Sequence, residues 1–139
     1  GKWRRPMNSL AVTTLYAGIL GLLLLALSLR VIVVVRAKGK VALGDGGNAD
    51  YGAVIRGQQN FVEYVPVALI LIGLAEYSGT APWIIHVLGV VLVIARLLHP
   101  LGLTPERGPT IPRLLGTVAT LSVVGVAAIV CLIAAIGAH

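Results

Sequence analysis

The sequence predicts an all-α membrane protein, a single bundle of four transmembrane helices. Hydrophobic residues make up 58% of the 139-residue chain and charged residues only 12%, whereas soluble proteins are roughly half apolar and a quarter charged. The segments 10–29 and 114–138 carry no charge and are long enough to cross a bilayer core. Because backbone polar groups in lipid must bond internally, these segments are expected to be helices. Nothing in the sequence alternates like the strands of a membrane barrel.

One domain of residues 1–139 is expected, with helices at about 10–35, 51–77, 81–98 and 113–138. A glycine-rich segment, 37–50, separates the first two helices, and a short uncharged turn at 78–80 separates the next two. Prolines and glycines between Pro100 and Pro112 mark the third connection. The glycine-rich segment lacks the ending of a phosphate loop and the spacing of a calcium loop, so it is interpreted as a flexible connector.

The N-terminus resembles a signal peptide, because three cationic residues (Lys2, Arg4 and Arg5) precede a leucine-rich run. The run is longer than a usual signal core and no small-x-small cleavage site follows it, so an uncleaved first helix is expected. The native start is either Gly1 or Met7. Lysines and arginines near the helix ends place the first and third connections in the cytoplasm and both termini outside, if the first few residues are partly foreign.

Several functional classes find no support in the sequence. The net charge of +6 comes from residues at helix ends rather than from a basic run interleaved with aromatics, so no nucleic-acid partner is expected. The three histidines, His86, His99 and His139, lack the spacing of metal ligands. Cys131 is the single cysteine and cannot form an intrachain disulfide. It is interpreted as a small residue that faces lipid or another helix.

The second expected helix opens with charged residues that are unusual in a membrane span. Arg56, Asn60 and Glu63 are spaced i, i+4 and i+7, which places them on one helical face with Gln59 beside them. Charges within a membrane are costly and indicate function. The Cα atoms of Arg56 and Glu63 should lie about 10.5 Å apart, which is long for a direct pair. Each charge is therefore expected to face another helix, another subunit or a ligand, with a structural network between helices as the alternative.

Further cationic residues are expected at the same membrane face. Arg36 ends the first helix, Arg96 and His99 end the third, and Arg113 begins the fourth. Snorkelling toward water accounts for any one of them singly. Together with the second helix they predict a cationic pocket that suits a ligand with more than one carboxylate and an amine. His86, expected in the middle of the third helix, is interpreted as a hydrogen-bonded structural histidine.

The run RGQQNFVEYVP at 56–66 resembles the signature of the MAPEG family, the membrane-associated proteins in eicosanoid and glutathione metabolism. The resemblance extends over essentially the whole chain, with an Ala-Arg-Leu run at 95–97 closing the third helix and Arg113 opening the fourth. Small bacterial members are more similar than the mammalian leukotriene and prostaglandin enzymes. The resemblance implies a left-handed four-helix bundle, assembled as a homotrimer, with glutathione bound between adjacent subunits.

The resemblance also implies roles for individual residues. The residues expected to bind glutathione are Arg36, Arg56, Gln59, Asn60, Glu63, Tyr64 and His99, with its carboxylates on arginine and its amine near Glu63. Arg113 is expected to be catalytic, because a fixed guanidinium beside the sulfur favours the nucleophilic thiolate. His99 stands where leukotriene synthase-like members carry a tyrosine, and their next tyrosine falls near Leu103. The third connection is also longer than theirs, so the match of Arg113 requires a gap.

The leading hypothesis is a membrane-bound glutathione transferase, with peroxidase activity as a further expectation. Its second substrate would be a lipophilic electrophile or hydroperoxide dissolved in the membrane lipid. The bacterial inner membrane is the expected location, with the glutathione site on the cytoplasmic side. The alternatives are a non-catalytic scaffold that binds lipid or another ligand, and a small transporter. The transporter is disfavoured because the charges cluster at one membrane face rather than along a path.

Overall fold

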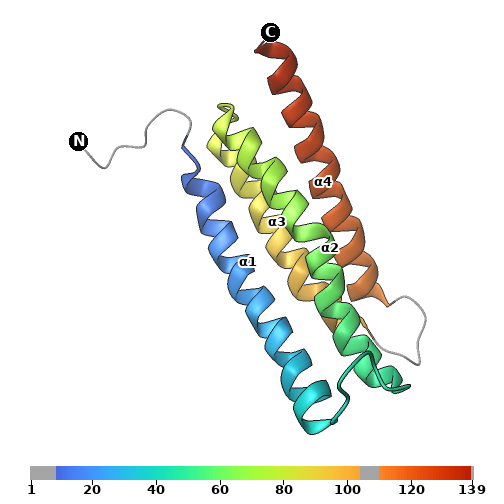
Figure 1. The fold of residues 1–139 in the computed structure, drawn as a ribbon. Helices are drawn as coiled ribbons and strands as arrows, with labels where there is room; N and C mark the ends of the chain where they lie inside the picture. The colour runs from blue at the N-terminus through green and yellow to red at the C-terminus, as the bar shows by residue number, and fades with distance from the viewer. Residues whose placement is uncertain (1–8, 104–109, 139) are drawn as a thin grey trace.

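The computed structural model describes residues 9–103 and 110–138. Its four long helices run side by side (Figure 1): α1 (Ala11–Arg30), continued by the π-helix η1 (Val31–Lys38), then α2 (Ala49–Tyr77), α3 (Pro82–Leu101) and α4 (Ile111–Gly137). All four are long and apolar enough to cross a membrane, with α1 and η1 forming one span. The predicted all-α bundle of four membrane-spanning helices is confirmed for the described residues.

The helix starts are fixed by side-chain caps and prolines. The N–H of Tyr51 donates to Asn48 Oδ1 over 3.1 Å, which caps α2. At the start of α4, Thr110 Oγ1 accepts from the N–H of Arg113 at 3.4 Å and donates to the carbonyl of Gly102 at 2.7 Å. Thr110 therefore ties the end of α3 to the first turn of α4 and fixes the position of Arg113.

The start of α1 is capped by a residue from another helix. The N–H groups of Val12 and Thr13 donate to the two carboxylate oxygens of Glu76, at 2.9 and 2.8 Å. Glu76 lies in the last turn of α2, so this carboxylate joins the start of α1 to the end of α2. A negative charge at a helix N-terminus also interacts favourably with the helix dipole.

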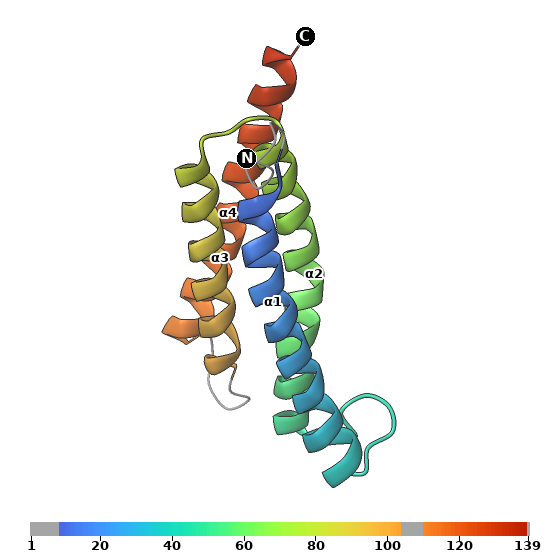
Figure 2. The same ribbon diagram turned by 90° about the vertical axis from the view of Figure 1, so that its left-hand side faces the viewer.

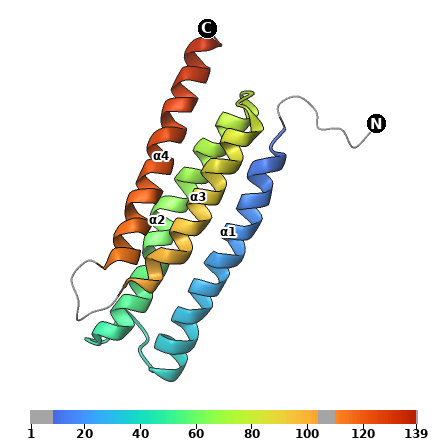
Figure 3. The same cartoon turned by 180° about the vertical axis from the view of Figure 1, so that it is seen from behind.

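The two middle helices of the bundle are α2 and α3. Each contacts all the others, whereas α1 and α4 do not contact each other within the described residues. Figure 3 shows α2 and α3 between α1 and α4, and Figure 2, seen from the side of α1, shows α4 behind. Residues from all four helices form one buried core. Its buried members are Val12, Tyr16, Leu20, Leu27, Phe61, Val65, Ala68, Ile72, Ala75, Ile85, Leu88, Leu92, Val123 and Ala127.

Most of the outer surface of the bundle is apolar. Leucines such as Leu22 and Leu132 are 70% and 63% exposed, and large exposed aliphatic side chains occur on every helix. So much contiguous apolar surface is unfavourable in water and fits lipid contact. The protein is therefore an integral membrane protein.

Two helix ends differ from the sequence-based expectation. The first span continues as a π-helix to Lys38, and α3 continues through Pro100 to Leu101 rather than ending near residue 98. A proline in the last turn is tolerated because it removes only one backbone hydrogen bond there. Both extensions lie at the end of the bundle that carries the candidate site.

Candidate functional site

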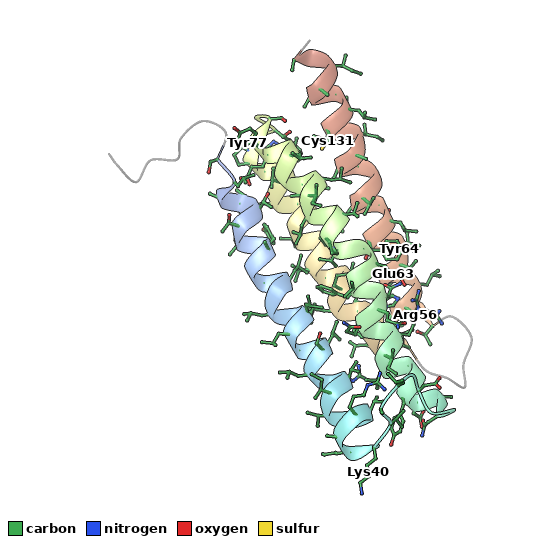
Figure 4. The ribbon with its side chains drawn as sticks, in the orientation of Figure 1. Lys40, Arg56, Glu63, Tyr64, Tyr77 and Cys131 are labelled. Carbon is green, nitrogen blue, oxygen red and sulfur yellow. The ribbon has the colours of Figure 1, made fainter. Side chains whose placement is uncertain are left out.

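The charged face of α2 forms an ion pair on the outside of the bundle. Arg56 Nη1 and Nη2 donate to Glu63 Oε1 and Oε2 at 2.7 and 3.2 Å. Both side chains are nearly half exposed, at 45% and 46%. Figure 4 shows Arg56, Glu63 and Tyr64 following one another along the lower half of α2.

The expectation that Arg56 and Glu63 would each face a different partner is wrong for the single chain. Both side chains are long and extend toward each other along the helix axis, so they bridge a distance between Cα atoms that shorter side chains could not span. The fork of a guanidinium also matches the two oxygens of a carboxylate, which favours a bidentate pair. The two charges thus satisfy each other when no ligand or second copy is present.

The residues beside this pair lie on two faces of α2. Gln59 is exposed, Asn60 is half-buried, and Phe61 is buried against the core. Tyr64 follows Glu63 in the sequence and is half-buried. The polar side chains of this stretch therefore range from the exposed ion pair to the half-buried Asn60 and Tyr64.

The two polar residues of α3 lie inside the bundle. Arg96 is fully buried, with 0% of its surface exposed, and His99 is 3% exposed. Arg96 Nη1 donates to Thr120 Oγ1 of α4 over 3.4 Å, and its guanidinium lies over the Phe61 ring at 5.6 Å from the ring centre. Snorkelling toward water, an interpretation open from the sequence, is therefore wrong for Arg96.

Close packing of α4 against α3 makes this interior arrangement possible. Gly116 of α4 is buried, and a Cβ atom at this position would lie 2.8 Å from both the Ala95 carbonyl and the His99 side chain. Gly57 of α2 is also buried and faces Pro100 and Leu103. Two glycines thus allow α2 and α4 to approach the end of α3, where His99 lies.

Arg113 is half-buried in the first turn of α4. Its backbone is held at both ends, since its N–H donates to Thr110 Oγ1 and its carbonyl accepts from Thr117 Oγ1 at 2.9 Å. A Cβ atom at Gly102, three residues after His99, would lie 2.7 Å from the Arg113 side chain. The structure thus places Arg113 of α4 beside the end of α3 that carries Arg96 and His99.

Arg36 makes its hydrogen bonds within the first connection rather than with the other cationic residues. It belongs to η1, and its Nη1 donates to the carbonyls of Val41 and Gly44, at 3.1 and 2.7 Å. In the single chain, Arg36 therefore holds the connection between η1 and α2.

Two polar contacts at the opposite end of the bundle are structural. Tyr16 Oη and His86 Nδ1 are 2.7 Å apart, with their rings edge to face. His86 lies in the second turn of α3 rather than mid-span as expected, and its interpretation as a hydrogen-bonded histidine is confirmed. The cap that Glu76 provides had no signal in the sequence, because the start of α1 and the end of α2 are far apart along the chain.

Open apolar grooves flank the far half of α2. One, between α2 and α4, has a volume of about 660 Å³ and is lined by residues that include Leu71, Tyr77 and Cys131. The other, between α1 and α2, has about 480 Å³ and includes Thr13 and Gly73. Cys131 Sγ donates to the Leu71 carbonyl at 3.1 Å, so the thiol is used in helix packing. Figure 4 shows Tyr77 and Cys131 near the end of the bundle remote from Arg56.

The described residues contain no group of three His, Cys, Asp or Glu side chains that could hold a metal ion. His139 lies outside the described residues. The side chains gathered at the candidate site are guanidinium groups, the Glu63 carboxylate, amides, a phenol and an imidazole. The chemistry of such a set suits an anionic or zwitterionic ligand.

Comparison with known proteins adds evidence from outside the structure. A sequence model of the MAPEG family matches residues 13–133, which reach into all four helices. The inner membrane protein YecN of Escherichia coli is 41% identical over 91 residues, which cover 66% of this chain and 69% of YecN. YecN of a second Escherichia coli strain gives the same identity and coverage.

Proposed function

Because the chain belongs to the MAPEG family, we propose that it is a membrane-bound enzyme that activates the thiol of glutathione. It conjugates glutathione to lipophilic electrophiles, or uses it to reduce lipophilic hydroperoxides. The observation that carries this proposal is the Arg56–Glu63 pair, an exposed cation and anion fixed side by side in a membrane-spanning helix.

The ion pair suits the amino-acid end of glutathione, which carries a carboxylate and an ammonium group. When the ligand binds, its carboxylate takes the place of Glu63 on Arg56, and its ammonium group pairs with the freed Glu63. One ion pair within the helix is thus replaced by two with the ligand, so the charges remain compensated. Gln59, Asn60 and Tyr64 lie within the same stretch of α2 and supply further hydrogen bonds.

Arg113 acts on the sulfur. Its backbone is fixed by Thr110 and Thr117, so its guanidinium starts from a defined position at the end of α4. A fixed cation beside the thiol stabilises the thiolate, which is the nucleophile. Stabilising the anion lowers the pKa of the bound glutathione thiol toward neutral pH.

The site is completed by neighbouring copies in a homotrimer. The Arg56–Glu63 pair faces outward from the bundle, and charged groups that face lipid are strongly unfavourable. Contact between the charged face of α2 and a second copy would remove these charges from lipid and enclose the ligand between subunits. Arg36 and His99 belong to the same end of the bundle and join the ligand-binding residues in the assembly.

The membrane is the bacterial inner membrane, since the relative YecN is an inner membrane protein. The end of η1, the start of α2, the end of α3 and the start of α4 lie together at one end of the bundle (Figure 1), which carries Arg36, Lys38, Lys40 and Arg113. Lysine and arginine concentrate on the cytoplasmic side of inner-membrane proteins. We therefore infer that the glutathione site faces the cytoplasm.

Replacement of Arg113 by alanine tests the catalytic part of the proposal. Turnover of glutathione with a lipophilic chloronitrobenzene, or with an organic hydroperoxide, should fall by about a hundredfold or more, as when a group that stabilises charge in the transition state is removed. Glutathione affinity, measured by calorimetry, should change much less. Unchanged turnover in this variant would contradict the catalytic role assigned to Arg113.

A non-catalytic lipid-binding scaffold is the second candidate, favoured by the two apolar grooves beside α2. Grooves of this size accommodate acyl chains, and they need no thiol chemistry. Saturable glutathione binding by the wild-type protein without turnover of any electrophile or hydroperoxide would favour the scaffold. A transporter has less support, since the charged residues gather at one end of the bundle.

A further inference from the structure

His86 presents a polar side chain on the outer surface of the membrane-spanning helix α3. The residue is exposed, and its neighbours on the same helical face, Trp83 and Val90, are 69% and 44% exposed. Histidines in membrane-spanning helices are rare, and most of them face the interior of a bundle. A polar group that faces lipid is unfavourable unless its hydrogen-bonding atoms have partners.

The contact with Tyr16 occupies only one of the two ring nitrogens of His86. Tyr16 Oη and His86 Nδ1 are 2.7 Å apart, and within the described residues this is the hydrogen bond that the ring makes. A phenol donates readily to an unprotonated imidazole nitrogen, and this arrangement leaves the ring proton on Nε2. The Nε2–H group is then a donor whose partner must come from outside the described residues.

The imidazole of His86 is held in a fixed orientation. Tyr16 is buried, at 6% exposed, and its ring packs so closely on α3 that a Cβ atom at Gly89 would overlap it. The rings of Tyr16 and His86 also meet edge to face, with their centres 5.6 Å apart. Because Nδ1 is bound to the buried Tyr16, Nε2 lies on the exposed side of the ring. It is therefore a preformed donor on the lipid-facing surface.

The position of His86 along α3 places this donor near the membrane surface. The helix begins at Pro82, so His86 lies only about 6 Å from its first residue along the axis. Trp83 and Tyr77, at the same end of the bundle (Figure 1), are 69% and 51% exposed, and exposed tryptophan and tyrosine mark the level of the lipid headgroups. Helical side chains lean toward the helix N-terminus, so the imidazole of His86 leans toward this level.

We propose that His86 binds the phosphate of a phospholipid headgroup in the leaflet opposite the Arg56–Glu63 pair. Nε2–H donates to a phosphate oxygen, because a charged acceptor forms a stronger hydrogen bond than the neutral ester oxygens of the lipid. The indole N–H of Trp83, one turn earlier on the same face, is a second donor to the headgroup. Tyr16 is a positioning residue, since it orients the imidazole without touching the lipid. The site does not depend on the function proposed above.

Solid-state NMR measures the proposed contact directly. The protein with ¹⁵N-labelled histidine would be reconstituted in bilayers of phosphatidylethanolamine and phosphatidylglycerol, and the dephasing of each imidazole ¹⁵N signal by the lipid ³¹P nuclei would be recorded. The signals of His86 are those missing from the spectrum of His86→Gln. We expect dephasing at His86 Nε2 and weaker dephasing at Nδ1. An Nε2 signal that is not dephased by ³¹P would overturn the proposal.

Two variants separate the outward donor from the bond to Tyr16. His86→Asn keeps an acceptor near the position of Nδ1 but lacks the outward N–H. The amount of phospholipid that stays bound in native mass spectrometry should therefore fall about threefold or more, as expected for the loss of one hydrogen bond. Tyr16→Phe keeps His86 but releases its ring, so the dephasing of Nε2 by ³¹P should weaken. Unchanged dephasing in Tyr16→Phe would contradict the positioning role.

Tyr77→Phe is the matched control. It removes the polar group of another exposed aromatic residue at the same end of the bundle, and phospholipid retention should stay within about 1.5-fold of the wild type, because the proposed site does not include Tyr77. Equal losses in Tyr77→Phe and His86→Asn would mean that retention reflects general contact with the membrane surface, and the proposed site would be wrong. A wild-type level of retention in His86→Asn would also contradict the proposal.

Discussion

The spacing of Arg56 and Glu63 on α2 was predicted correctly from the sequence, but the ion pair between their side chains was not. Their spacing on one face of α2 was visible in the sequence, and so was their unusual position in a membrane span. The direct pair was not, because the axial separation of the Cα atoms says little about how far two long side chains extend. In the structure they meet at 2.7 Å, so a ligand that bound here would have to compete with an existing ion pair.

Glu63→Gln should therefore have opposite effects on two ligands. Glutathione should bind about tenfold more weakly, because its ammonium group loses a charged partner. An analogue of glutathione without the amino group should bind at least as tightly as it does to the wild type, because Arg56 is released from Glu63. Calorimetry with both ligands measures this. Equal weakening of both ligands would contradict the exchange of ion pairs.

Glu76→Gln is the matched control, since it makes the same chemical change at the other end of α2. It should leave glutathione affinity unchanged. Its effect should be on stability, because the charged cap of α1 is lost. We expect the free energy of unfolding in detergent to fall by about 1–2 kcal/mol, measured as a lower midpoint of thermal unfolding. An unchanged midpoint would mean that the cap contributes little.

Which side of a helix faces the core was the main feature that the sequence could not supply. Helices that cross a membrane are apolar all round, so the usual contrast between a polar and an apolar face is weak. The number of helices and their approximate ranges followed from the long apolar segments. These segments could not predict that Arg96 points into the bundle and Arg56 away from it, because both directions depend on how the helices are rotated against each other.

The approach of α4 to α3 can be tested with two glycines of the same helix. Gly116 is buried against Ala95 and His99, whereas a Cβ atom at Gly125 would meet nothing within 4 Å. Gly116→Ala should lower the free energy of unfolding by about 1–3 kcal/mol through overpacking. Gly125→Ala should leave it unchanged or raise it by up to about 1 kcal/mol, because alanine favours the helix.

Thermal unfolding of both variants in the same detergent gives the comparison. Gly116→Ala should also weaken glutathione binding if His99 is part of the site, since the added methyl group displaces it. Equal midpoints for the two variants would show that α3 and α4 are not held as closely as the structure describes.

At the scale of the whole molecule, the bundle accounts for membrane insertion but leaves the charged face of α2 uncovered. A homotrimer would cover it, and this assembly remains a prediction from the family resemblance. Native mass spectrometry of the protein released from detergent should give a mass of three chains. A monomer in both detergent and lipid nanodiscs would contradict a site shared between subunits, and the outward ion pair would then face lipid.

The measurement that most directly tests thiol activation is the ultraviolet difference spectrum of the purified protein with glutathione near neutral pH. Free glutathione is largely protonated under these conditions, so a thiolate band reports a thiol pKa lowered by the protein. We predict a saturable band in the wild type that is lost in Arg113→Ala while glutathione still binds. The absence of a band in the wild type, with no binding by calorimetry, would contradict the account of this protein as a glutathione-activating enzyme.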